Sequence, residues 1–241
     1  MSVFLLSGVL PAGLAERFYA AARDVFELPE DEKLACLRRG MAGGYTPPGI
    51  EGVHGKEPDR RRRFWDTVAA EHGGGRYPDS DVGRAYRDAA EGLYAACDAA
   101  AHPFFRARYP VIAPLLGGGR HLLRASAYAA ERAGEILFPS HVDFGLATFY
   151  VGGAPLGLQG HIDGGWVDLA AEPGDLLVGL GTTLRLYDPA VVPLRHRVLG
   201  TGAPRVSAVF FTEPRGDVTL PNGVRADEHL RRLVSQIRRE A

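Results

Sequence analysis

Two histidines and an aspartate are the residues of this 241-residue chain whose types and spacing best fit a metal site. His141 and Asp143 are two positions apart. Residues i and i+2 of a β-strand point to the same face, so an imidazole and a carboxylate can converge on one ion. His196, farther along the chain, is the candidate third ligand. Such a set leaves coordination positions open, as in non-haem iron(II) centres. Alone, the His-x-Asp pair is weak evidence, because chance produces it often, and a hydrogen-bonded surface pair is then the favoured interpretation.

Two further groups of polar residues lie at the same spacing in apolar segments. Arg205 and Ser207 are followed by Ala-Val-Phe-Phe. An arginine that points inward from such a strand needs a buried anionic partner, because an unpaired charge is costly to bury. The alternative is an ion pair at the surface. Arg124, Ser126 and Tyr128 are also spaced by two and predict one shared polar face.

The first 119 residues are expected to be mostly helical. Apolar residues recur at helical spacing from Leu14 to Val25, a second helix is expected to begin at Leu28-Pro, and a long helix is predicted from about Asp79 to Arg108. The segment 40–58 is rich in glycine and proline and is predicted to be a loop. Met1 to Leu10 is apolar but lacks a basic region and a cleavage site, so we expect a strand or core segment and a cytoplasmic protein.

After residue 120 the sequence pattern is typical of β-strands, because short apolar or alternating segments are separated by glycine and proline. The expected strands are 121–128, 145–151, 165–169, 175–180, 183–187, 196–199 and 205–212. This pattern favours a sandwich or barrel, including the double-sheet jelly roll. We therefore predict one compact, mainly β domain with α additions. Its parts are a helical support region (1–119), a jelly-roll catalytic core (120–215) and a short C-terminal tail with a helix (216–241).

Charge and composition argue against several classes of protein. The net charge of −1 gives no global field that would attract nucleic acid or an anionic membrane. No apolar stretch approaches the ~20 residues of a membrane span. Cys36 and Cys97 are not a short-spaced pair, so no disulfide framework or thiolate zinc site is expected. The arginine run 60–63 is interpreted as a solvated helix face. His161 and Asp163 lie among glycines and are interpreted as a hairpin turn.

The order of these features resembles the isopenicillin N synthase-like branch of the iron(II)/2-oxoglutarate oxygenases. His141-Val-Asp-Phe-Gly-Leu-Ala-Thr is similar to the family's His-x-Asp-x-Gly-x-x-Thr block, His196-Arg-Val to its distal-histidine block, and Arg205-Val-Ser to its Arg-x-Ser motif. Three intervening landmarks also match: Gly157-Leu-Gln, Gly165-Trp-Val and Pro173-Gly-Asp-Leu-Leu-Val. The resemblance covers roughly residues 8 to 220 and is strongest from 123 to 214.

The resemblance implies a dioxygenase with a double-stranded β-helix core. By this resemblance, His141, Asp143 and His196 bind iron(II), and the cosubstrates 2-oxoglutarate and O2 use the open positions. The far carboxylate of 2-oxoglutarate suits the planar fork of a guanidinium with a hydroxyl beside it.

Four residues are expected to contact this cosubstrate. Arg205, Ser207 and Tyr128 match positions at the far carboxylate. Ser126 stands where many relatives have an asparagine near the chelating end, so its role is less well defined.

The resemblance further implies a small-molecule substrate, typical of secondary metabolism, that is hydroxylated, desaturated or cyclised. Parity and resemblance place five residues at the substrate pocket: Tyr45, Arg124, Phe144, Arg185 and Phe211. Arg124 either anchors an acidic substrate or forms a structural ion pair. No nucleic-acid or membrane partner is expected, and a homo-oligomer is compatible with the sequence but not predicted.

Three alternatives stay open. The first is a relative that oxidises its substrate with oxygen without consuming 2-oxoglutarate. The second is a jelly-roll hydrolase or isomerase that holds another metal with the same ligands, against which Arg205 and Ser207 argue. The third is a non-catalytic binding protein, against which the intact ligand set argues.

Overall fold

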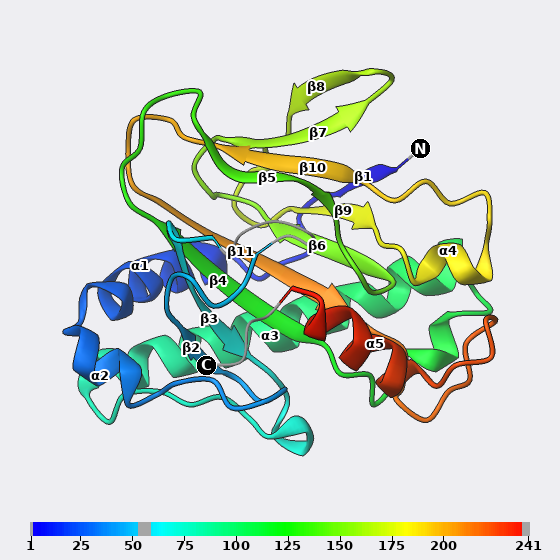
Figure 1. Ribbon diagram of the computed structural model, residues 1–241, viewed down its shortest axis with the longest axis horizontal. Coiled ribbons are helices and arrows are strands. Elements are labelled where there is room, and N and C mark those ends of the chain that lie inside the picture. The colour runs from blue at the N-terminus through cyan, green and yellow to red at the C-terminus, as the bar shows by residue number, and fades with distance from the viewer. Residues whose placement is uncertain (1, 53–58, 238–241) are drawn as a thin grey trace.

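The computed structural model describes residues 2–52 and 59–237. Two antiparallel sheets dominate this part of the chain, and Figure 1 shows the smaller sheet stacked over one face of the larger, with α1 and α3 on the other face. The larger sheet has the order β1-β9-β6-β11-β4-β3-β2, and the smaller has the order β5-β10-β7-β8. This arrangement confirms the predicted jelly-roll fold with helical additions.

The bounds of the strands are as follows. The larger sheet contains β1 (Val3–Leu6), β2 (Gly44–Thr46), β3 (Arg62–Thr67), β4 (Leu122–Tyr128), β6 (Ala147–Val151), β9 (Leu176–Leu180) and β11 (Arg205–Thr212). The smaller sheet contains β5 (Ile136–Val142), β7 (Leu158–Ile162), β8 (Gly165–Asp168) and β10 (Arg195–Leu199). The first three strands come from the region expected to be mostly helical, so that region also completes the larger sheet.

The α-helices are α1 (Leu14–Glu27), α2 (Glu30–Leu34), α3 (Asp81–Arg108), α4 (Leu184–Tyr187) and α5 (Ala226–Ser235), and short 3-10 turns span Ala70–His72 and Ala113–Leu115. The predicted apolar stripe of α1, which includes Phe18 and Val25, is buried. Helix α3 begins where Ser80 Oγ accepts a hydrogen bond from the Gly83 N–H at 3.2 Å, which satisfies one of the free N–H groups at the helix start. No helix in the described ranges is long and apolar enough to cross a membrane.

Alternation along the strands of the larger sheet separates an apolar core from a polar cavity face. On β11, Ala208 and Phe210 pack in the core with the helices, whereas Val209 packs in a second cluster toward the smaller sheet. Arg205 and Ser207 share the parity of Val209, so they also face the space between the sheets. The strand therefore places the polar pair in the interior of the jelly roll.

Two local predictions were wrong. The segment 183–187 forms helix α4 instead of a strand. It follows Gly181, whose backbone lies so close to the carbonyls of Phe144 and Gly145 that a side chain there would clash. The arginine run does not lie on a helix: Arg60 and Arg61 are exposed, whereas Arg62 and Arg63 begin strand β3, and the Arg62 guanidinium is buried 4.0 Å above the Phe138 ring. Stacking on an aromatic ring lets an arginine occupy a buried strand position.

Candidate metal centre

The three predicted metal ligands converge on one wall of a cavity between the two sheets. The cavity has a volume of about 480 Å³, within the range of small-molecule sites. His141 on β5 lies directly opposite His196 on β10 in the antiparallel register, and Asp143 follows β5 immediately. His141 Nε2 lies 3.4 Å from Asp143 Oδ1, and His196 Nε2 lies 3.6 Å from Asp143 Oδ2. The candidate ligand atoms all lie within 4.8 Å of one another, so one ion can contact all three.

Backbone carbonyls fix both imidazole rings in the same way. His141 Nδ1 lies 2.9 Å from the Pro139 carbonyl oxygen, and His196 Nδ1 lies 3.1 Å from the Leu194 carbonyl oxygen. A carbonyl oxygen only accepts hydrogen bonds, so each Nδ1 carries the proton and donates it. In the neutral imidazole each Nε2 then lacks a proton and lies toward Asp143, which is the tautomer that a metal-binding histidine needs.

Two hydroxyl groups that sequence analysis did not assign hold the Asp143 carboxylate. Thr148 Oγ1 and Tyr150 Oη donate to Asp143 Oδ2 at 2.8 and 3.1 Å. Both residues lie on β6 at a spacing of two, so the parity that identified the other pairs could have found them. They occupy Oδ2 and leave Oδ1 without a hydroxyl donor. Partners of this kind orient a metal ligand and tune its basicity.

The charge states of Asp143 and His196 also suit a cation. Burial alone would raise the pKa of Asp143, but His196, His141 and the Thr148 hydrogen bond outweigh it and hold the pKa below its usual range. Burial lowers the pKa of His196 to about 4, so its imidazole is neutral near pH 7. One carboxylate and two imidazoles with open positions beside them are the donor set of mononuclear iron(II) sites. The residues present therefore fit the expected ion.

Arg205 is a buried cation without an anionic partner among the described residues. Its side chain is 4% exposed, and it donates to the Leu156 carbonyl at 3.3 Å and to Ser207 Oγ at 2.5 Å. In residues 2–52 and 59–237 no carboxylate pairs with it. Burial lowers the pKa of its guanidinium. A buried arginine in this state fits an anionic ligand that enters the cavity.

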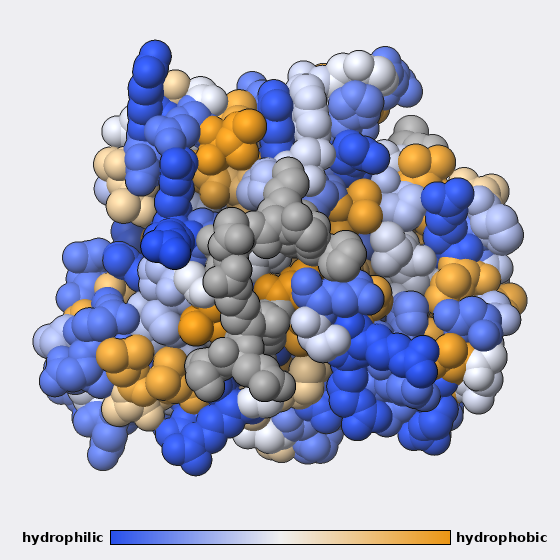
Figure 2. Space-filling view, in the orientation of Figure 1, coloured by the Kyte–Doolittle hydropathy of each residue, from blue (hydrophilic) through white to orange (hydrophobic). Residues whose placement is uncertain are grey.

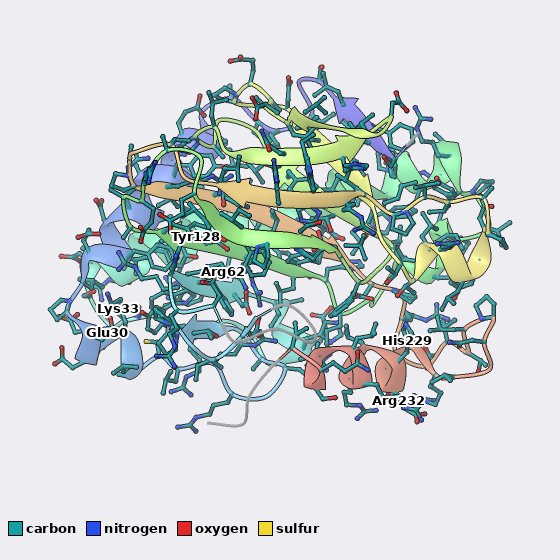
Figure 3. The ribbon with its side chains drawn as sticks, turned by 45° about the horizontal axis from the view of Figure 1, so that its top comes forward. Glu30, Lys33, Arg62, Tyr128, His229 and Arg232 are labelled. Carbon is teal, nitrogen blue, oxygen red and sulfur yellow. The ribbon has the colours of Figure 1, made fainter. Side chains whose placement is uncertain are left out.

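The other predicted cosubstrate residues surround this arginine. Tyr128 lies opposite Arg205, and Ser126 lies opposite Ser207, in the antiparallel pairing of β4 with β11. All four line the cavity. Burial raises the pKa of Tyr128, so its hydroxyl keeps its proton and can donate. Figure 3 shows Arg62, from the neighbouring strand β3, close to Tyr128, which it faces in register.

Three of the five predicted substrate residues line the cavity: Arg124, Phe144 and Phe211. Arg124 donates to Asp66 at 2.7 and 2.9 Å and to Glu51 at 2.9 Å, so of the two interpretations offered from the sequence the structure shows the ion pair.

The structure does not bring Tyr45 and Arg185 to the cavity. Tyr45 is fully buried against Trp65, with its hydroxyl 3.0 Å from Glu30, because β2 packs on the helical side. Arg185 lies on the exposed face of α4. The two placements at the pocket were wrong because they assumed strands and loops that run along the site.

Comparisons with known proteins yield a partial sequence match and extensive structural matches. No family model matches the chain. Deacetoxycephalosporin C synthase from Amycolatopsis lactamdurans is 40% identical over 67 residues, which are 25% of this chain and 21% of that protein. The chain thus spans about a fifth of the length of the curated relative that it matches.

Solved structures match almost the whole described fold. A full-length protein of Neurospora crassa in complex with alpha-KG superposes with a TM-score of 0.82 at 18% identity, over 97% of this chain and 86% of that one. A putative 2OG-Fe(II) oxygenase family protein from Caulobacter crescentus gives 0.78 at 24% identity, over 97% and 89%. A dioxygenase for auxin oxidation from rice gives 0.71 at 19% identity, over 99% and 87%. Together these matches confirm the resemblance found in the sequence, and at these identities the structures establish the shared fold.

Proposed function

We propose that this chain, which has the fold of the iron(II)/2-oxoglutarate oxygenases, is itself an iron(II)- and 2-oxoglutarate-dependent oxygenase of a small molecule. The observation that carries this proposal is the buried Arg205, which has no carboxylate partner in the described chain and opens on the same cavity as the histidine–aspartate triad. A zinc hydrolase or isomerase with the same ligands has no need of a second, buried anion site.

Each side chain has a defined task in this function. His141, Asp143 and His196 would hold iron(II), which together with 2-oxoglutarate and O2 supplies the oxidising chemistry while the cosubstrate is converted to succinate. Arg205 binds the far carboxylate of 2-oxoglutarate, and Ser207 and Tyr128 donate to it. Ser126 lies nearer the chelating end. Thr148 and Tyr150 keep the Asp143 carboxylate in one orientation.

The size of the cavity supports a small-molecule substrate. About 480 Å³ between the sheets accommodates the cosubstrate and a compact organic molecule. Structural neighbours were solved with such ligands: the full-length N. crassa protein with 5-formyluracil, and JOX2 with JA. The partial match to deacetoxycephalosporin C synthase supports a role in secondary metabolism by hydroxylation, desaturation or cyclisation. We retain the cytoplasm as the expected location.

Anaerobic visible absorption tests the proposal directly. Apoprotein is titrated with iron(II) and then with 2-oxoglutarate, and a metal-to-ligand charge-transfer band is expected that needs both additions. His141→Ala is expected to abolish the band, and Arg205→Ala to raise the 2-oxoglutarate concentration needed for it by at least tenfold. Arg195→Ala, which removes an exposed arginine of β10, is the matched control and is expected to behave like the wild type. Iron binding without a band would instead favour the oxidase that uses oxygen alone.

A further inference from the structure

The series of residues on the cavity-facing side of β11 continues beyond the last residue of the strand. Arg205, Ser207, Val209 and Phe211 alternate along it, and Glu213, the next residue of this parity, also lines the cavity. Its exposed fraction is 8%. At about 3.3 Å per residue, the two ends of this series are roughly 25 Å apart. The cavity-facing side of β11, together with the residue that follows the strand, thus runs from a buried cation to a buried carboxyl group.

The metal site lies between these two ends. Tyr150, whose hydroxyl contacts Asp143, is opposite Val209 on β11, near the middle of the series. Glu213 lies beside the loop that follows Asp143, where a Cβ on Gly145 would come within 2.7 Å of Glu213 Oε1. Gly145 has a φ of +68°, so glycine is favoured there for its backbone as well as for the room it leaves. The carboxyl group therefore lies beyond the metal from the cosubstrate anchor.

The Glu213 carboxyl group has no protein partner in residues 2–52 and 59–237. The Glu213 backbone N–H donates to His121 Nδ1 at 3.0 Å and fixes the backbone, while the side chain makes neither a hydrogen bond nor an ion pair. The nearby Arg124 is committed to Asp66 and Glu51, and Arg120 donates to the His72 carbonyl at 3.2 Å. Burial raises the pKa of Glu213 to about 8, and no charged residue in the described part of the chain offsets this effect. An isolated buried acid of this kind is suited to a cationic ligand.

We propose that Glu213 determines substrate specificity by binding a protonated amine, so that the substrate is a small molecule with a cationic nitrogen at the end remote from 2-oxoglutarate. This inference rests on the proposed function, because it assumes that Arg205 serves the cosubstrate and leaves the Glu213 end to the substrate. A charge-assisted hydrogen bond in the cavity then fixes the substrate at one point beyond the metal. Phe144 and Phe211, which line the cavity, would add apolar contacts to the substrate.

Calorimetric binding of matched probes tests this inference. Protein loaded anaerobically with iron(II) and 2-oxoglutarate is titrated with butylamine, benzylamine and phenethylamine, and with the alcohols of the same carbon skeletons. At least one amine is expected to bind the wild type tenfold or more tightly than its alcohol. Glu213→Gln, which keeps the shape of the side chain, is expected to lose this preference. Asp217→Asn removes an exposed carboxylate four residues away and is expected to keep it.

Each outcome gives a decision. The inference is overturned if no amine is preferred by the wild type, or if Glu213→Gln retains the preference. The charge-transfer band is recorded in the same samples. An intact band without amine selectivity would contradict the inference about Glu213 and leave the proposed function standing. Absence of the band would contradict the proposed function. In that case the amine selectivity is measured in titrations without 2-oxoglutarate. An unchanged band in Glu213→Gln shows that the variant is folded and that its 2-oxoglutarate site is intact.

Discussion

Arg205 carries a charge that no carboxylate in the described chain neutralises. A residue kept for packing would be replaced by an apolar side chain of similar length without loss, because an isolated buried charge opposes folding. Its presence in the interior therefore indicates a ligand that supplies the missing anion. Glu213 is likewise a buried ionisable group without a partner in the described chain, so its presence indicates a ligand that supplies a cation.

Arg205→Met is accordingly expected to abolish the binding of 2-oxoglutarate without lowering the free energy of unfolding. Without 2-oxoglutarate, the variant should be at least as stable as the wild type, with a gain on the order of 1 kcal/mol, because the desolvated charge is gone. Excess 2-oxoglutarate, added with metal, should stabilise the wild type by mass action and leave the variant unchanged. Urea unfolding with and without the ligand measures both effects. A variant that is several kcal/mol less stable without ligand would mean that Arg205 is structural.

Glu213 gives a pH dependence whose sign follows from its pKa. The folded protein holds this proton up to about pH 8, whereas an exposed glutamate releases it near pH 4. The folded state is therefore favoured by this group at low pH, and the benefit is lost as the pH rises toward 8. Glu213→Gln should equal the wild type near pH 4.5 and exceed it at pH 8.5 by on the order of 3 kcal/mol. A difference in unfolding free energy that does not change with pH would contradict the buried, unpaired state.

At the residue scale, whether a contact could be predicted from the sequence depends on how far apart its two residues lie along the chain. Strand parity identified the pairs His141–Asp143 and Arg205–Ser207, because a spacing of two is a local signal, and the family resemblance supported His196 as the third ligand. The partners of Arg124 were not accessible, since Asp66 and Glu51 lie 58 and 73 residues away and no local pattern links them. Glu213 was missed because it follows the strand, where parity was not extended.

At the scale of elements, a buried set of charges joins β4, β3 and the segment around β2. Arg124 on β4 and Arg38 before β2 both donate to Asp66 on β3, and both also contact Glu51. Two arginines and two carboxylates balance in charge, and all four are buried. This cluster fixes the edge of the larger sheet that lines the cavity, so it orders the site without contacting the metal ligands.

Removal of one member should be costly. Asp66→Asn is expected to lower the free energy of unfolding by about 3–5 kcal/mol, because two buried guanidinium groups lose their shared carboxylate. Glu27→Gln is the matched control, since it removes the partner of Arg63 from an exposed pair that contributes little. Chemical denaturation of the two variants measures the difference. Similar small losses in both would show that the cluster is solvated and exchangeable.

Elements were predicted well where one periodicity dominates, as in α1, α3 and β11. Strand β3 was missed because a run of arginines precedes and begins it. The Arg62 guanidinium overlies Phe138 and Phe64, and its Nε lies 3.6 Å from Asp59 Oδ2, which explains how that charge is buried in a sheet. Strands β5 and β7 were not delimited, because glycine, proline and histidine interrupt their apolar pattern. These features depend on cross-strand neighbours, which a single sequence does not reveal.

At the scale of the molecule, the cavity is bounded by the last described helix. Leu230 and Val234 of α5 line it, together with Ile237, whose carbonyl accepts a hydrogen bond from the Gly52 N–H at 3.0 Å. The outer face of α5 is hydrophilic in Figure 2, consistent with a helix that covers an apolar space with one side and meets water with the other. Helix α5 follows the segment that carries Glu213, so it borders the proposed substrate end.

A chain that ends at Arg225 should therefore keep the cosubstrate site and lose the enclosure of the substrate end. Only Ala226 of α5 is fully buried, so the truncated chain is expected to fold. Its charge-transfer band with iron(II) and 2-oxoglutarate should persist at similar affinity, since Arg205 lies at the opposite end of β11. Binding of the amine probes should weaken at least tenfold, because the apolar wall is removed and water enters. Leu230→Ser with Val234→Ser in the full chain should weaken it in the same direction. If the truncated protein lost 2-oxoglutarate and retained the amines, the assignment of the two ends of the cavity would be reversed.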